Sequence, residues 1–185
     1  EYNGDNAKEF GEQKYQESIK NFQQMEKRFK ELPHTRIVMT GTSPYDETAQ
    51  IKDNTVFKKK NETIKRIIEY QRESAARNGW EFTDWNAPMV AINQELQQKD
   101  PSFTLCGNDR IHPDNDGHMV MAYLFLKAQG FAGKDVANME INANKKQAVK
   151  AEGCTISNIK KIGKDISFDY LAEALPYPLD TIARG

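Results

Sequence analysis

Residues 36–46 have the sequence RIVMTGTSPYD, and they decide which fold class the chain predicts. Arg36 to Thr40 form a short apolar run, which is typical of a strand in a parallel sheet covered on both faces. The loop at residues 41–46 follows the carboxyl end of that strand, and ligand sites of open α/β sheets gather at this edge. We therefore expect a buried parallel strand whose following loop borders a binding site.

Amphipathic helices are predicted on both sides of this strand. Apolar side chains recur at three- and four-residue steps between residues 10 and 32, and Pro33 ends this helix because proline cannot donate the next backbone hydrogen bond. A second helix is predicted over residues 54–78, then a strand at 80–85 and a shorter helix that ends near Asp100. This alternation indicates a doubly wound α/β sheet rather than a helix bundle.

The pattern of the sequence changes at about residue 131. Residues 136–141 and 154–159 alternate apolar and polar side chains, as strands do. We therefore expect an α/β domain over residues 1–131 and a small β-rich extension over residues 132–185.

The composition excludes several classes of partner. The 185 residues carry a net charge of -1, so no excess of Lys and Arg marks a nucleic-acid or membrane surface. The basic run at residues 58–60 is predicted to be the solvated face of a helix. No apolar stretch approaches the ~20 residues that span a bilayer, and residues 1–6 do not resemble a signal peptide. Cys106 and Cys154 fit no zinc motif; we expect two buried thiols, which could pair in an oxidising compartment.

Residues 109–118, DRIHPDNDGH, hold two of the three histidines of the chain. Asp109 stands three residues before His112, and a carboxylate at that spacing can fix the tautomer of the imidazole and stabilise its protonated form, as a general base requires. The alternative is that Asp109 forms a turn, His112 lies on the surface and residues 114–117 cap the next helix. That helix, at residues 119–126, is apolar nearly all round and is therefore expected to be buried on more than one side.

Other chemistries fit residues 109–118 less well. A calcium loop aligned on Gly117 would place His112 and Tyr123 where carboxylates are required. Zinc would need Asp109 beside His112 and His118, but this spacing matches no zinc-protease pattern. Phosphate binding would need a Gly-rich loop, and glycosidase chemistry would need two facing carboxylates, which a single sequence does not reveal.

Nucleophilic acyl transfer remains, with His112 as the base, Asp109 as its orienting partner and a serine from elsewhere. Ser43 is a poor candidate for that serine, because it precedes a proline and no Gly-x-Ser-x-Gly turn surrounds it. No metal or organic cofactor is expected for this reaction.

Residues 109–113, followed by a Gly-His pair and an apolar helix, resemble the last conserved block of the SGNH/GDSL hydrolases. Residues 41–46 and 84–89 resemble the carbohydrate-esterase-like bacterial branch of that family, and the similarity covers roughly residues 1–130. The resemblance implies a three-layer α/β/α sandwich with a parallel sheet, in which Asp109 and His112 belong to a catalytic triad. It also implies a secreted or periplasmic serine esterase that deacetylates a carbohydrate or a similar ester.

The chain departs from the family pattern at the nucleophile. It contains no Gly-Asp-Ser triplet, and residues 4–6, Gly-Asp-Asn, have the wrong order for the family's Asn block. We therefore expect an upstream segment or a complementary chain to supply the serine, the oxyanion donors and the first strand. Tyr45 and Trp85 could line a sugar site, although Trp85 suits a core equally well. The alternative function is a non-catalytic carbohydrate-binding or assembly module.

Overall fold

The computed structural model describes residues 7–52 and 54–174. Residues 4–6, considered above for an oxyanion role, lie outside the described residues. The chain divides into two compact units, Glu1–Gly130 and Phe131–Gly185.

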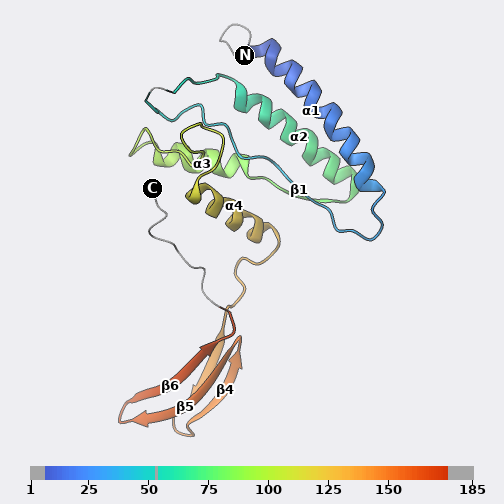
Figure 1. The fold of residues 1–185 in the computed structure, drawn as a ribbon. Helices are drawn as coiled ribbons and strands as arrows, with labels where there is room; N and C mark the ends of the chain where they lie inside the picture. Colours follow the sequence, from blue (N-terminus) through green and yellow to red (C-terminus); the bar gives the residue numbers. More distant parts are fainter. Residues whose placement is uncertain (1–6, 53, 175–185) are drawn as a thin grey trace. The chain divides into compact units, whose positions relative to one another are not determined.

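The first unit contains four helices and one pair of strands in its described part (Figure 1). The strands β1 (Val38–Thr40) and β2 (Glu81–Thr83) pair in parallel. The helix α2 packs against both strands and along α1, and α4 contacts β2. The helices are α1 (Ala7–Lys30), α2 (Lys60–Asn78), α3 (Asn86–Leu96) and α4 (Asn115–Ala128).

The predicted three-layer sandwich on a parallel sheet is wrong for the described residues. The strands β1 and β2 lie within the two segments predicted to be strands, but they form a sheet of two strands only, each with three residues. The other strand pairs in the described chain are antiparallel and belong to the second unit. The alternation of helices and strands located the strands correctly, but it does not determine how many strands pair with one another.

The start of α2 is stabilised by a carboxylate from a distant loop. Lys59, at the N-cap position, has a left-handed backbone with φ of 65° and makes no side-chain capping bond of its own. Instead, the Glu47 carboxylate accepts hydrogen bonds from the backbone N–H groups of Lys59, at 2.9 Å, and Asn61, at 2.8 Å. These donors have no partner within the helix, so Glu47 both satisfies them and ties its own loop to α2. The helix ends at Gly79, the predicted stop.

One buried cluster of the first unit lies between α3 and the segment that follows it. Met89, Leu105 and Cys106 are buried there, and Trp85 packs against them. Trp85 is thus a core residue, and its indole N–H has no hydrogen-bond partner among the described residues.

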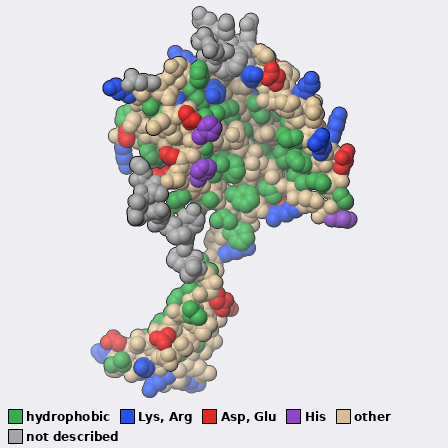
Figure 2. Space-filling model, in the orientation of Figure 1, with side chains coloured by type: hydrophobic (Ala, Val, Ile, Leu, Met, Phe, Trp, Pro, Cys, Tyr) green, Lys and Arg blue, Asp and Glu red, His purple; other side chains and the backbone are tan. Residues whose placement is uncertain are grey.

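The apolar helix α4 is less buried than its sequence predicts. Gly117 is its one fully buried residue, whereas the side chains of Tyr123 and Leu126 are 60% and 48% exposed. The expectation of burial on more than one side is therefore wrong within the described residues. Figure 2 shows hydrophobic side chains gathered on the visible face of the first unit. An exposed apolar surface of this kind is typical of a site where another segment or protein packs.

The second unit consists of two antiparallel strand pairs in its described part. The strand β3 (Asn138–Asn142) pairs with β4 (Gln147–Glu152), and β5 (Cys154–Ile162) pairs with β6 (Asp165–Ala172). Gly153 connects the two pairs with a positive φ of 66°, and a Cβ there would lie 2.4 Å from the Val136 carbonyl oxygen. Only glycine fits this turn without strain.

No helix in the described chain is long and apolar enough to cross a membrane.

We expect Glu47→Gln to lower the free energy of unfolding by about 1 kcal/mol, because the amide loses the charge and one of the two acceptor oxygens at the start of α2. Urea denaturation measures the change. The control is Glu69→Gln, since the Glu69 carboxylate contacts Arg72 on an exposed surface of the same helix. A pair of this kind contributes within about 0.5 kcal/mol. Equal losses in the two variants would contradict the capping role of Glu47.

Candidate functional site

The loop before α4 folds around the carboxylate of Asp109. One carboxylate oxygen accepts hydrogen bonds from the backbone N–H groups of Ile111, at 3.1 Å, and His112, at 3.0 Å. The other oxygen bonds to Nδ1 of the His112 ring. Because Asp109 and His112 are three residues apart in one turn, the short Asp109 side chain reaches both the backbone and the ring of His112. The structure thus brings together the two residues that the sequence singles out.

These contacts set the electrostatics of the pair. The backbone N–H of His112, followed by its ring, lowers the pKa of the Asp109 carboxyl from 3.8 to about 2. Asp109 is therefore ionised at neutral pH. A carboxylate at Nδ1 favours the tautomer with its proton on that nitrogen and leaves Nε2 as the basic atom. The His112 side chain is 84% exposed, so a reacting group can approach it.

Arg110 anchors this loop to the loop after β1. Its side chain is 1% exposed and its φ is 70°, a left-handed conformation. The guanidinium donates to the carbonyl oxygens of Ala49, at 2.7 Å, and Asp46, at 3.2 Å, and to the side-chain oxygen of Asn54, at 3.0 Å. In return, the backbone N–H of Asp46 donates to the Arg110 carbonyl at 2.8 Å. Arg110 therefore fixes where its neighbour Asp109 lies.

A buried polar network supports the loop after β1. The Asp46 carboxylate accepts hydrogen bonds from two side-chain amides, that of Asn93 at 3.0 Å and that of Gln97 at 2.9 Å. Asn93 lies within α3, and Gln97 is the residue directly after it. Asn61 and Asn86 exchange side-chain hydrogen bonds, which join the starts of α2 and α3. The sequence singles out the stretches that contain Asp46 and Asn86 but not the contacts of these residues, and its patterns do not identify Asn61, Asn93 or Gln97. A sequence would mark such residues as polar side chains on the apolar face of a helix. A single sequence does not distinguish them from polar side chains on the face exposed to solvent.

The hydroxyl of Ser43 and the thiol of Cys106 both make hydrogen bonds of their own. Ser43 is 8% exposed, and its hydroxyl donates to the Ile111 carbonyl at 3.3 Å rather than to the His112 ring. Burial raises the pKa of the Cys106 thiol to about 11, and that thiol donates to the Pro44 carbonyl at 3.3 Å. Cys154 is also buried, and both cysteines are unpaired. Neither Ser43 nor Cys106 is placed as a nucleophile for His112.

The remaining residues of the 109–118 stretch shape the start of α4. The Asp114 side chain caps the helix by accepting from the Gly117 N–H at 3.2 Å. His118 lies in the first turn, where its backbone N–H donates to the Asp114 carbonyl. Across residues 7–52 and 54–174, no three His, Cys, Asp or Glu side chains converge as a metal site would require. This finding gives the zinc alternative no support.

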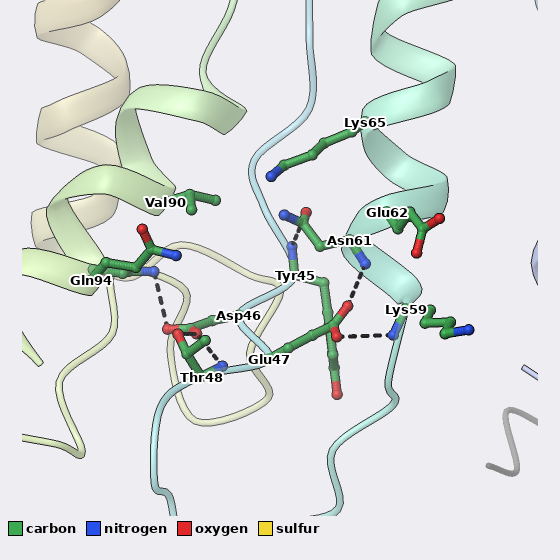
Figure 3. A pocket seen from close by; sticks show the side chains of 11 residues that line it. Tyr45, Asp46, Glu47, Thr48, Lys59, Asn61, Glu62, Lys65, Val90 and Gln94 are labelled. Carbon is green, nitrogen blue, oxygen red and sulfur yellow. Dashed lines mark hydrogen bonds between the residues drawn. The ribbon is translucent and has the colours of Figure 1, made fainter.

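A separate pocket of about 300 Å³ opens between the loop after β1, the start of α2 and the face of α3 (Figure 3). The residues that line the pocket include Tyr45, Asp46, Asn61, Lys65 and Gln94. Asp109 and His112 do not line this pocket. The structure thus places Tyr45 in a pocket wall, although its side chain is 2% exposed and its hydroxyl bonds to backbone atoms of residues 55 and 57.

Comparisons with known proteins assign no family to this chain. No protein-family model matches it, and no curated protein is significantly similar to it.

The Asp109 carboxyl is expected to titrate with a midpoint at about pH 2. Because this folded-state pKa lies below the unfolded value of about 3.9, Asp109 stabilises the fold above about pH 4, and the contribution is lost as the pH falls through about 2. In His112→Ala the midpoint should rise only part of the way, since the backbone N–H of residue 112 remains. Carboxyl ¹³C NMR against pH measures both values. A midpoint at the ordinary value in the unmodified protein would contradict the described contacts.

Gly117→Ala should destabilise the start of α4. An added Cβ would lie 2.2 Å from the Leu105 carbonyl oxygen and 2.8 Å from the Pro113 side chain. We expect the free energy of unfolding to fall by about 1 to 3 kcal/mol, because close-packed atoms must move apart. Ala128→Gln, at an exposed position in the last turn of α4, is the control and should change stability within about 0.5 kcal/mol. Denaturant unfolding that shows no loss for Gly117→Ala would show that the close approach is wrong.

Proposed function

We propose that the protein is a serine ester hydrolase in which His112 is the general base and Asp109 orients it. The observation that carries the proposal is the Asp109 carboxylate bound to Nδ1 of an imidazole whose ring is exposed to an approaching group. A charged carboxylate at Nδ1 with a free Nε2 is the arrangement that acyl-transfer catalysis requires of its base.

In the proposed reaction, Nε2 of His112 removes the proton of a serine hydroxyl as that oxygen attacks the acyl carbon of the ester. The imidazolium then gives this proton to the departing alcohol, and an acyl-serine remains. Water attacks the acyl-serine by the same route, with His112 first accepting a proton from water and then returning it to the serine. Asp109 stays ionised throughout and stabilises the positive charge on the ring. The reaction needs no metal or organic cofactor.

The proposal assigns the serine and the oxyanion donors to a segment or chain other than residues 1–185. No serine in the described part of the chain bonds to the His112 ring, and Ser43 donates to a backbone carbonyl instead. Two features support a complementary element. Within the described residues β1 pairs only with β2, and apolar side chains of α4 remain exposed. Both are surfaces that a packing element would cover.

An acetylated carbohydrate or a similar glycan ester is the proposed substrate, and a secreted or periplasmic location is proposed with it. The support is the resemblance of residues 41–46, 84–89 and 109–113 to the carbohydrate-esterase-like hydrolases.

The test is hydrolysis of 4-nitrophenyl acetate by the intact protein, including any sequence beyond residues 1–185. We expect His112→Ala to lower kcat by roughly 10³-fold or more, because the serine loses its base. His118→Ala is the matched control, since His118 is an exposed histidine in the same stretch that makes no contact with Asp109 in the described structure. Its kcat should stay within about twofold of the unmodified protein, as expected for a surface change of about 0.4 kcal/mol.

Retention of the full rate by His112→Ala would remove His112 from the mechanism. Binding of glycans by the intact protein without any turnover would favour the non-catalytic carbohydrate-binding module.

A further inference from the structure

Lys60 lies over the ring of Tyr45, in the loop that the backbone bond from Asp46 to Arg110 joins to the loop of Asp109, and its environment is unlike that of the other lysines of its basic run. It is the first residue of α2 and is half-buried, whereas Lys58 and Lys59 are exposed. The expectation that residues 58–60 form one solvated face is therefore wrong for Lys60. The sequence does not distinguish these three lysines, because their environment depends on the loop that packs over the start of α2.

Two aromatic rings hold the Lys60 ammonium. Its nitrogen lies 4.3 Å from the centroid of the Tyr45 ring and 5.5 Å from that of the Phe57 ring. The two rings are themselves in contact, with centroids 6.1 Å apart. Tyr45 is fixed, because its side chain is 2% exposed and its hydroxyl accepts a hydrogen bond from the Phe57 backbone. The ammonium thus lies against the faces of two aromatic rings, which attract its charge.

Two opposing effects act on the charge of Lys60. Burial lowers the pKa of the Lys60 ammonium, and the Asp109 carboxylate opposes that effect. Asp109 nevertheless forms no ion pair with Lys60 in the described structure. Its carboxylate accepts hydrogen bonds from the backbone N–H groups of Ile111 and His112 and contacts the His112 ring.

The hydrogen-bonding capacity of Lys60 is therefore not used within the described structure. An ammonium has three N–H donors, and aromatic rings attract its charge without supplying an oxygen acceptor. In the described part of the chain, no carboxylate forms an ion pair with Lys60. A partly desolvated cation without an anionic partner is costly, and a ligand oxygen that supplies the partner binds there favourably.

We propose that Lys60 binds a carboxylate of the substrate, so that the protein acts on esters whose alcohol part carries a negative charge. This inference rests on the proposed esterase function, because the carboxylate would bind over the loop that Asp46 and Arg110 join to the loop of the proposed base. The Tyr45 and Phe57 rings hold the ammonium in position, and the substrate oxygens take the hydrogen bonds that the rings do not supply.

The test compares two esters that differ in one charge: 4-acetoxybenzoate, which is anionic, and its neutral methyl ester. The quantity measured is the ratio of kcat/KM for the anionic ester to that for the neutral ester. We expect Lys60→Met to lower this ratio by roughly 10-fold to 100-fold, the loss typical of a hydrogen bond to a charged group. Lys60→Arg should restore most of the ratio because it keeps the charge, and Lys58→Met, an exposed neighbour, is the control that leaves the ratio unchanged.

A second measurement does not depend on turnover. Benzoate is titrated into the intact protein while the Lys60 side-chain signals are followed by NMR, and the same titration is repeated with Lys60→Met. We expect saturable shifts of Lys60 and at least tenfold weaker benzoate binding in the variant, since about 1.4 kcal/mol corresponds to a factor of ten.

The outcomes separate the two proposals. Hydrolysis of both esters with a ratio that Lys60→Met does not change overturns the role of Lys60 and leaves it a structural cation over two rings. Lys60-dependent binding of benzoate without hydrolysis of either ester supports the carboxylate site and overturns the esterase function. Neither hydrolysis nor Lys60-dependent binding overturns both.

Discussion

The buried guanidinium of Arg110 is the contact on which the candidate site depends. It is 1% exposed and donates to two backbone carbonyls and one side-chain amide of the loop after β1. Removing a buried charge from its acceptors is costly, so Arg110 opposes separation of the loop with Asp109 and His112 from the loop with Tyr45. Through Tyr45 the same contact also fixes the ammonium of Lys60. One buried side chain thus joins the base, its orienting carboxylate and the proposed anion site.

The sequence predicts the local contacts of this site and misses the long-range ones. The spacing of Asp109 and His112 allows a carboxylate at the ring, because both lie in one turn, but it also allows a turn-forming Asp109 beside a surface histidine. The structure shows features of both, since the carboxylate contacts the ring and the His112 side chain is exposed. The strand segments that hold β1 and β2 are equally visible, since short apolar runs between amphipathic helices are typical of strands. The positions of Arg110, Asp46 and Lys60 follow from how distant loops pack, and no pattern around them in the sequence contains that information.

The fold-class error has a related cause. A regular alternation of helices and strands predicts the type of each element, but the sheet depends on which strands are present to pair. In the described residues only β1 and β2 pair in parallel, and α4 leaves Tyr123 and Leu126 largely exposed. The same surfaces that contradict the predicted sandwich are those on which a complementary element would pack, and such an element is also what the proposed nucleophile requires.

The central claim is that Asp109 makes Nε2 of His112 the basic nitrogen of the site. The measurement that tests it most directly is ¹⁵N NMR of the His112 ring at a pH where the imidazole is neutral, in the unmodified protein and in Asp109→Asn. The account predicts the proton on Nδ1 and a free lone pair on Nε2 in the unmodified protein, with loss of that preference in the variant. A neutral ring with its proton on Nε2, or the same tautomer in both proteins, would contradict the claim.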